Sequence, residues 1–151
     1  MSQSDVMIPQ ALIEGARIGL ITDVDGTISP LVDQPDAAQV TARSKELLTA
    51  LHAHLALVAV ISGRAAADVR DRVGVPELVY VGNHGIERWT DGGIVTPPEV
   101  AQHRPALEKV RDDLNAKLLD GMMIEDKTVT LTIHYRNAPD PQDALERFRP
   151  V

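Results

Sequence analysis

Apolar and polar stretches alternate along the first 82 residues in a way that predicts three strands. Residues 17–24, 55–61 and 78–81 are short runs rich in aliphatic and β-branched side chains, and each ends directly before a polar segment containing glycine. Such runs are typical of buried strands. The run at 55–61, LALVAVI, is apolar at every position, which predicts a strand covered on both faces of its sheet.

Two helices are predicted between these strands. Thr41 is a suitable N-cap for the first helix. Its apolar face would comprise Val40, Leu47, Leu48 and Leu51. Residues 65–73 are predicted to form a shorter helix that Gly74 and Pro76 would end. Strands and helices that alternate with short links predict an α/β fold with a doubly wound, Rossmann-like parallel sheet.

The second half of the chain follows a different pattern. Residues 89–98 contain a Gly-Gly and a Pro-Pro pair, which predict a hairpin followed by a linker. A helix is predicted from Pro105 to Gly121, and strands at 122–124 and 129–134. The predicted domains are therefore an N-terminal core at 1–90, a linker at 91–98 and an α+β unit at 99–151.

Composition narrows the class of protein. The net charge is −7 and aromatic residues make up 3% of the chain, whereas nucleic-acid surfaces normally need a basic face and stacking rings, so no nucleic-acid partner is expected. The absence of cysteine excludes disulfides and thiolate metal sites. No apolar run approaches the roughly 20 residues of a membrane span. The first ten residues also lack a signal-peptide pattern. A soluble, cytoplasmic protein that does not bind membranes is expected.

The most informative segment is Asp23-Val24-Asp25-Gly26-Thr27, at the end of the first predicted strand. Ligands of open α/β sheets bind beyond the carboxyl ends of the strands, and two carboxylates two residues apart would both face that crevice. One of the two aspartates is predicted to attack phosphorus as a nucleophile. The other is predicted to protonate the leaving oxygen and later to activate water, and Thr27 is predicted to donate to phosphate oxygens. The alternative is an ordinary acidic turn.

Polar segments also follow the other two predicted strands. Ser62, Gly63 and Arg64 come directly after the second strand, and a small hydroxyl followed by glycine and a helix suits a phosphate oxygen. A helix cap is the alternative. Asn83 and His84 follow the third strand and are predicted to line the same site, although Asn and Gly are also common in purely structural turns.

Together these segments resemble the haloacid-dehalogenase-like phosphatases and, within them, the trehalose-6-phosphate phosphatases. The run DVDGTISPLVDQPDA, the SGR motif and the GNHGIE motif are similar to motifs of that family. The family's Glu-Asp-Lys and His-Tyr-Arg motifs are matched at 125–127 and 134–136 with the same spacing. The resemblance extends from about residue 15 to residue 141, and it implies an incomplete haloacid-dehalogenase-like core with part of an α+β cap domain.

By this resemblance, the chain would hydrolyse trehalose 6-phosphate in a Mg²⁺-dependent reaction. Asp23 would be the nucleophile, Asp25 the general acid and base, and both aspartates would hold the metal. The phosphate would be bound by Thr27, Ser62, Gly63 and Arg64. The substrate would also contact Asn83 and His84, and its sugar hydroxyls would contact Glu125, Lys127 and Arg136 of the cap.

The last predicted strand has two chemically different faces. Alternation in TVTLTIHY would place Val129, Leu131 and Ile133 on one face and Thr130, Thr132 and His134 on the other. Lys127 and Arg136 flank this strand, and a sugar phosphate needs both cations and hydroxyl-accepting groups. The alternative is a solvated hairpin with alternating charges.

The sequence does not contain two further parts of the family's machinery, a later lysine and a Gly-Asp-Asp-x-x-Asp segment. Asp112-Asp113 is expected on a solvated helix face, and Glu125-Asp126 lacks the preceding Gly-Asp, so neither pair is expected to substitute. We therefore expect a truncated fragment with weak Mg²⁺ binding and little turnover. Its first strand would be an exposed sheet edge that permits self-association. The alternatives are a phosphatase for another sugar phosphate and a non-catalytic sugar-phosphate-binding fragment.

Overall fold

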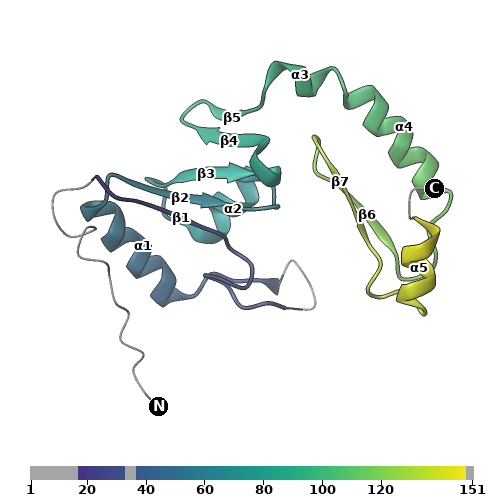
Figure 1. Cartoon of the computed structure of the whole chain (residues 1–151), viewed down its shortest axis with the longest axis horizontal. Coiled ribbons are helices and arrows are strands. Elements are labelled where there is room, and N and C mark those ends of the chain that lie inside the picture. The colour runs from purple at the N-terminus through teal and green to yellow at the C-terminus, as the bar shows by residue number, and fades with distance from the viewer. Residues whose placement is uncertain (1–16, 33–36, 149–151) are drawn as a thin grey trace, which may run out of the picture.

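The computed structural model describes residues 17–32 and 37–148 as an open sheet with helices, followed by a second unit of helices and a hairpin (Figure 1). The N-terminal segment without a signal-peptide pattern and the Pro35-Asp36 part of the motif lie outside these described residues. Within them, none of the helices is long and apolar enough to cross a membrane.

The main sheet has the strand order β1-β2-β3-β4-β5 in the described part of the chain. The parallel strands are β1 (Gly19–Thr22), β2 (Leu57–Ile61) and β3 (Val79–Gly82), and the antiparallel strands β4 (Glu87–Thr90) and β5 (Gly93–Val95) extend the sheet. The α/β class is therefore confirmed, and the hairpin predicted within residues 89–98 is formed by β4 and β5 and belongs to the same sheet.

The register of the parallel strands aligns their carboxyl ends. Thr22 of β1 pairs with Val60 of β2, and Ile61 of β2 pairs with Val81 of β3. The residues that directly follow each strand are therefore brought to one edge of the sheet. This alignment gathers the polar segments that the sequence predicts to share a site.

The two predicted helices of the core form as local sequence signals indicate. Helix α1 (Ala42–His54) begins after Thr41, whose hydroxyl oxygen accepts a hydrogen bond from the Ser44 N–H at 3.0 Å. Helix α2 (Ala66–Val73) ends at Gly74, whose φ of 66° lies in the left-handed region that favours glycine.

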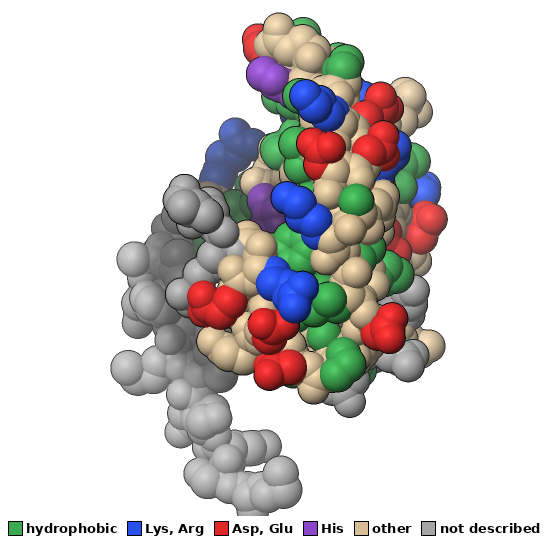
Figure 2. Space-filling model, turned by 90° about the vertical axis from the view of Figure 1, so that its right-hand side faces the viewer, with side chains coloured by type: hydrophobic (Ala, Val, Ile, Leu, Met, Phe, Trp, Pro, Cys, Tyr) green, Lys and Arg blue, Asp and Glu red, His purple; other side chains and the backbone are tan. Residues whose placement is uncertain are grey.

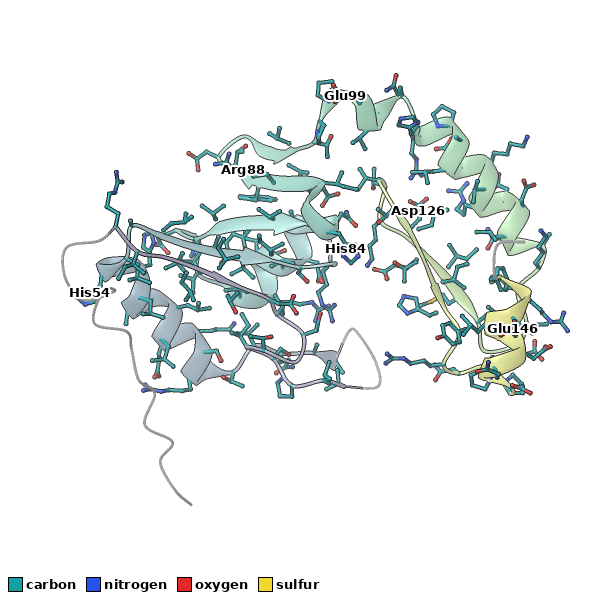
Figure 3. The ribbon with its side chains drawn as sticks, in the orientation of Figure 1. His54, His84, Arg88, Glu99, Asp126 and Glu146 are labelled. Atoms are coloured by element: carbon teal, nitrogen blue, oxygen red, sulfur yellow. The ribbon has the colours of Figure 1, made fainter. Side chains whose placement is uncertain are left out.

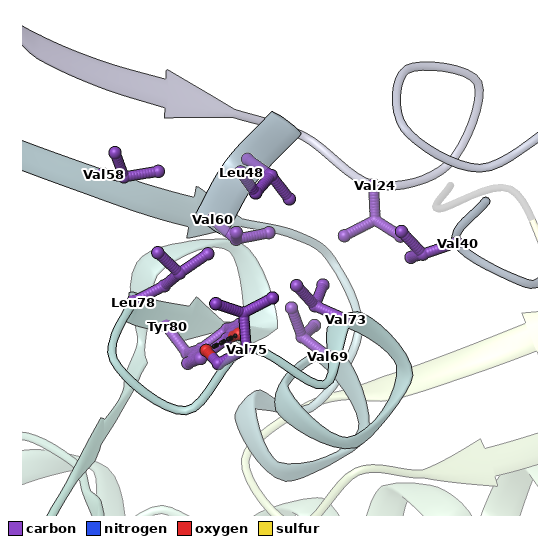
Figure 4. Packing of buried hydrophobic residues seen from close by; sticks show 10 residues of the cluster. All are labelled: Val24, Val40, Leu48, Val58, Val60, Val69, Val73, Val75, Leu78 and Tyr80. Atoms are coloured by element: carbon purple, nitrogen blue, oxygen red, sulfur yellow. Dashed lines mark hydrogen bonds between the residues drawn. The ribbon is translucent and has the colours of Figure 1, made fainter. Parts of the chain in front are cut away.

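Both helices cover the same face of the sheet. Val58 and Val60 of β2 lie in one buried cluster with Leu48 of α1 and Val69 of α2 (Figure 4). The remaining members are Val24, Val40, Val73, Val75, Leu78 and Tyr80. Successive crossovers of one hand between neighbouring strands place their helices on one side. The fold therefore has its core between this face and the two helices.

The opposite face of the sheet is partly open among the described residues. Leu57 is 42% exposed and Ile61 is 36% exposed, whereas Ala59 between them is 4% exposed. The prediction that the second strand is covered on both faces therefore holds only for the middle of β2 in this part of the chain. An uninterrupted apolar run shows that a strand is hydrophobic but does not show which elements cover it. Leu47 is also exposed, because the packed face of α1 is narrower than the predicted one.

The second unit comprises three helices and a hairpin within the described residues. Their bounds are α3 (Pro98–Ala101), α4 (Arg104–Asn115), β6 (Met123–Asp126), β7 (Leu131–His134) and α5 (Pro141–Arg147). Strands β6 and β7 pair antiparallel as a separate sheet. Figure 2 shows that the face of the molecule formed by this unit carries acidic and basic side chains intermixed with hydrophobic ones.

Two local features of this unit differ from the sequence prediction. Helix α4 ends at Asn115, before Gly121. Gly121 instead sits in a tight turn with a φ of 77°, where an added Cβ would lie 2.0 Å from the carbonyl oxygen of Asn137. The short helix α3 was not predicted, and the residues that link it to β5 are Thr96 and Pro97. The predicted domain limits stay a prediction.

Candidate active site

The carboxyl edge of the sheet contains a cavity of about 440 Å³ beside the predicted nucleophile. Asp23, Ser62, Gly63 and His84 line it, together with the ends of β1 and β2. Asp23 is exposed, and its carboxylate has no hydrogen-bond or ion-pair partner among the described residues. The structure therefore places a carboxylate that is open to a ligand beside the serine predicted to bind phosphate.

A second cavity, of about 700 Å³, adjoins the first and lies between the sheet edge and the second unit. Gly63 and His84 line both cavities. The second cavity is also lined by Asp25, Arg64, Glu125, Lys127 and Arg136. Figure 3 shows His84 at the end of the sheet, facing the hairpin that carries Asp126. Most of the predicted site residues are thus brought together around these two spaces.

The loop after β1 is folded around the backbone of Val24. The Val24 carbonyl oxygen accepts hydrogen bonds from the N–H groups of Thr27, Ile28 and Ser29 at 3.2, 3.1 and 3.0 Å. The Val24 side chain is fully buried. The Thr27 N–H is therefore engaged within the loop, and Thr27 lines neither of the two cavities. Because Thr27 lies outside both cavities, no contact in the structure supports its predicted binding to phosphate.

Asp25 is held by Arg64 in a two-point ion pair. The guanidinium Nε donates to Oδ2 at 2.8 Å, and Nη2 donates to Oδ1 at 2.9 Å. Arg64 also donates to Asp68, a residue of α2 that lines the larger cavity. The hydrogen bonding of the Arg64 guanidinium to the Asp25 carboxylate is the main cause of the raised pKa of Arg64. Asp25, the predicted general acid and base, is thus held by Arg64, which belongs to the loop predicted to bind phosphate.

The Ser62–Gly63 loop is shaped by close contacts with its neighbours. The Ser62 hydroxyl oxygen accepts a hydrogen bond from the Arg64 N–H at 3.2 Å. At Gly63, an added Cβ would lie 2.5 Å from Cε1 of the His84 ring, so the imidazole covers the backbone there. The absence of a side chain at Gly63 permits this close approach of the ring.

Asn83 is placed at a junction between the two units. Its side chain is fully buried. Its Oδ1 accepts a hydrogen bond from the Thr130 hydroxyl at 2.8 Å, and its Nδ2 donates to the Lys127 carbonyl oxygen at 3.4 Å. Asn83 therefore connects the loop after β3 to the hairpin of the second unit, and it lines neither cavity.

The hairpin supplies polar groups to the larger cavity. The Lys127 ammonium donates to the Gly63 carbonyl oxygen at 3.0 Å and lies 3.7 Å from Glu125 Oε2. The same Glu125 oxygen lies 2.8 Å from His134 Nε2. His134 was not among the predicted site residues, although alternation placed it on one face with Thr132, and both line the cavity.

Glu87 is a second residue that the sequence prediction of the site missed. It is buried in β4, and its Oε2 accepts a hydrogen bond from the Ala66 N–H at 2.8 Å. Ala65, the N-cap of α2, has no side-chain capping bond, so Glu87 performs that role from another strand. The GNHGIE motif was the available signal, but it did not reveal which atoms the glutamate would reach.

The two aspartates have the donor chemistry that Mg²⁺ requires, because carboxylate oxygens are its preferred protein ligands. Their environments differ, since Asp23 is exposed and both oxygens of Asp25 are bonded to Arg64. Within the described residues, no group of three or more His, Asp or Glu side chains is arranged to hold a metal ion. A cation at this edge would therefore bind first to Asp23.

These observations define a class of protein. An α/β core with paired aspartates at the carboxyl edge of its sheet, faced by an α+β unit, is the architecture predicted for haloacid-dehalogenase-like phosphatases, and the fold class is confirmed. Residues 21–148 match the family model described as trehalose-phosphatase. The chain belongs to the trehalose-phosphatase family.

Relatives and solved structures agree with this assignment. The chain is 40% identical over 129 residues to a trehalose-phosphate phosphatase of Mycobacterium avium and 41% identical over 125 residues to one of Mycobacterium ulcerans, covering 83% and 81% of this chain. It spans about a third of the length of these curated relatives, 33% and 32%. The C-terminal domain of a trehalose-6-phosphate phosphatase from C. albicans shares its fold with a TM-score of 0.69 and 26% identity, covering 85% of this chain and 46% of that chain. A trehalose-6-phosphate phosphatase related protein shares the fold with a TM-score of 0.70 and 18% identity, over 86% of this chain and 57% of that chain.

Proposed function

We propose that this chain carries the nucleophile and part of the sugar-binding surface of a Mg²⁺-dependent phosphatase that hydrolyses trehalose 6-phosphate through an aspartyl phosphate on Asp23. The observation that carries the proposal is the exposed Asp23 carboxylate, which has no partner among the described residues and shares a cavity with Ser62 at the carboxyl edge of the sheet. Membership of the trehalose-phosphatase family and the names of its relatives suggest the reaction and the substrate.

The proposed reaction has two steps. A carboxylate oxygen of Asp23 forms a bond to phosphorus, and the bond from phosphorus to the sugar oxygen breaks, with Asp25 giving its proton to that oxygen. Water then attacks phosphorus, Asp25 takes a proton from the water, and the bond to Asp23 breaks to release phosphate. Because Arg64 holds both oxygens of Asp25, one of them must leave the guanidinium before it can carry a proton to the substrate.

The charge of the phosphate has to be offset during this reaction. Bound Mg²⁺ would neutralise part of the negative charge that builds up on the phosphate oxygens. Asp23 would hold the metal, joined by Asp25 once Arg64 releases it. Ser62 and Gly63 line the cavity beside Asp23, and the Ser62 hydroxyl and the backbone of Gly63 would orient the phosphate there.

The larger cavity is the proposed binding site for the sugar. Its volume of about 700 Å³ lies in the range of ligand sites in proteins. Glu125 and His134 offer hydrogen-bonding groups for hydroxyls, while Lys127 and Arg136 supply positive charge from the second unit. Gly63 and His84 line both this cavity and the one beside Asp23, so the two proposed subsites adjoin.

Two alternatives remain in the proposal. The same surface would accept another sugar phosphate, which a substrate panel on a full-length relative would decide. A non-catalytic sugar-phosphate-binding role for this chain alone is favoured by one observation, the engagement of both Asp25 oxygens by Arg64. For this reason we expect weak Mg²⁺ binding and little turnover from the 151-residue protein.

The test measures binding and turnover on the same samples. Calorimetry with trehalose 6-phosphate, with and without Mg²⁺, is expected to show binding that weakens when Lys127 is replaced by Met. Asp23→Asn is expected to retain sugar-phosphate binding but to lose the Mg²⁺-dependent gain in affinity, with Asp112→Asn as the control on a solvated helix face. Binding that is insensitive to both Lys127→Met and Asp23→Asn would contradict the proposed site. Robust phosphate release by the wild type would contradict the expectation of low turnover.

Cytoplasmic location and self-association stay predictions. In the described part of the chain, β1 is an edge strand and its Ile21 side chain is largely exposed. Exposed edge strands are common sites of pairing between chains. A molecular mass that rises with protein concentration, measured by sedimentation, is the expected result if this edge pairs, whereas a constant monomer mass would contradict it.

A further inference from the structure

The turn between β6 and β7 is strained and tightly closed. Thr128 has a φ of 73°, a region that β-branched residues rarely occupy and that costs free energy. The turn is closed by hydrogen bonds from the Lys127 N–H to the Thr130 carbonyl oxygen at 3.0 Å and from the Val129 N–H to the Lys127 carbonyl oxygen at 2.8 Å. A strained conformation of this kind persists only where surrounding contacts hold it.

Arg104 of α4 contacts both the side chain of Asp126, before the turn, and the backbone of Thr128 within it. Its Nη1 and Nη2 donate to Oδ1 and Oδ2 of Asp126 at 2.7 and 2.8 Å, and Nη1 also donates to the Thr128 carbonyl oxygen at 2.9 Å. Asp126 Oδ1 accepts a hydrogen bond from the Thr128 N–H at 2.9 Å, and Arg111 donates to Oδ2 at 3.1 Å. The residues on both sides of Lys127 are therefore fixed to helix α4.

The position of the Lys127 ammonium depends on this arrangement. Its side chain is 12% exposed, and its ammonium reaches across to the Gly63 carbonyl oxygen in the sheet unit at 3.0 Å. Arg104 and Asp126 themselves do not line the larger cavity. Their influence on a ligand there is therefore indirect, and Lys127 lies between the two residues that Arg104 contacts, Asp126 and Thr128.

We propose that Arg104 and Asp126 are positioning residues for sugar-phosphate binding, because they hold the strained turn that presents Lys127 to the cavity beside the Ser62–Gly63 loop. The ligand part of this inference rests on the proposed function. The geometric part does not, since it concerns only where the Lys127 ammonium lies.

The geometric part is tested by the reactivity of lysine amines. The chain contains lysines at 45, 109, 117 and 127, so modification by an amine-specific reagent can be followed at each site by mass spectrometry. Arg104→Gln and Asp126→Asn are expected to raise the modification rate of Lys127 about three- to tenfold, the range that corresponds to losing an exposed ion-pair cluster. Lys45 and Lys117 serve as internal standards whose rates should stay constant.

Two matched variants separate the two-point contact from charge alone. Arg104→Lys keeps the positive charge but cannot donate to both oxygens of Asp126 in a fork, so it should raise Lys127 reactivity nearly as much as Arg104→Gln. Arg147→Gln removes the exposed ion pair with Asp143 on α5 and should leave Lys127 reactivity unchanged.

The ligand part is tested by a double-mutant cycle on the affinity for trehalose 6-phosphate. Arg104→Gln is expected to weaken binding about three- to tenfold in the wild-type background and to have no further effect in the Lys127→Met background. A purely structural role would weaken binding equally in both backgrounds, and that result would overturn the proposal.

The two parts can fail separately. Unchanged Lys127 reactivity in both Arg104→Gln and Asp126→Asn overturns the positioning role whatever the ligand result. Raised reactivity combined with no measurable binding of trehalose 6-phosphate to the wild type supports the positioning of Lys127 and counts against the proposed function instead.

Discussion

Arg64 grips both carboxylate oxygens of Asp25, at 2.8 and 2.9 Å, while the neighbouring Asp23 carboxylate has no partner among the described residues. The Arg64 side chain is 14% exposed, so this pair is partly withdrawn from water. The two aspartates of one motif thus have different surroundings. Asp25 is part of an ion-pair network that extends through Arg64 to Asp68 of α2, whereas Asp23 is exposed.

The first prediction compares these two aspartates. Asp25→Asn is expected to lower the free energy of unfolding by about 1–2 kcal/mol, because it leaves the partly buried Arg64 without its main counter-charge. Asp23→Asn is expected to change it by less than about 0.5 kcal/mol. Urea unfolding at neutral pH measures both values. Equal losses would show that Asp23 has structural contacts comparable to those of Asp25.

The second prediction concerns Gly82 at the end of β3. An added Cβ would lie 2.2 Å from the backbone nitrogen of Ala66 in α2, and backbone atoms cannot move aside as a side chain can. Gly82→Ala is therefore expected to destabilise the fold by about 3 kcal/mol or more. Gly92→Ala is the matched control, since its nearest neighbour would be 3.9 Å away. Thermal unfolding checks both, and similar midpoints for the two variants would contradict the prediction.

Gly63 allows a subtler third prediction. An added Cβ would clash with the His84 ring at 2.5 Å, but this exposed side chain can rotate away. Gly63→Ala is expected to cost only about 1 kcal/mol of stability while moving the imidazole away from the two cavities. The ring resonances of His84 in an NMR spectrum of the Gly63→Ala variant should shift. The affinity of this variant for inorganic phosphate should be lower than that of the wild type. An unshifted ring would show that the backbone adjusts instead.

The fourth prediction tests the cap that Glu87 provides. Glu87→Gln is expected to be tolerated better than Glu87→Ala, because glutamine retains an acceptor for the Ala66 N–H whereas alanine leaves that buried donor unpaired, at a cost of about 1–3 kcal/mol. Glu99→Ala, at an exposed position of α3, is the control and should be nearly neutral. Hydrogen exchange of the first turn of α2 provides a local readout, and unchanged exchange in Glu87→Ala would refute the capping role.

The fifth prediction is a loss of stability at high pH. Burial raises the pKa of Tyr80 to about 12, and its hydroxyl donates to the Val75 carbonyl oxygen. The unfolded phenol ionises near pH 10, so the folded protein keeps its full stability below that pH and loses it as the pH rises towards 12. The slope should reach about 1.4 kcal/mol per pH unit. Urea unfolding from pH 8 to pH 11.5 should show this slope, and Tyr80→Phe should lack it.

Sequence reasoning was most successful where the cause was local. Thr41 and Gly74 mark helix ends because capping depends on adjacent residues. The gathering of Asp23 and Ser62 was also predictable, since parallel strands that pair in register bring their carboxyl ends together.

Features that depend on distant segments could not be predicted. Nothing in the run at 55–61 indicates that both helices cover one face of the sheet, because that follows from the direction of the crossovers. Asn83 was predicted to contact substrate, but its side-chain amide forms hydrogen bonds with the Thr130 hydroxyl and the Lys127 carbonyl oxygen of the hairpin. The contact of Arg104 with Asp126 joins residues 22 positions apart, and no local pattern identifies such a pair.

The short connection between β5 and α3 has a mechanical consequence. Thr96 and Pro97 form the joint, Pro97 has a φ of −55°, and Pro98 begins the helix, so few backbone torsions are left to rotate. A rotation of the second unit relative to the sheet would occur about Thr96 and Pro97. The displacement of a residue in that unit would then increase with its distance from these two residues. Helix α5, at the far end in Figure 1, would sweep the widest arc. A small rotation at these two residues would thus become a larger displacement at α5.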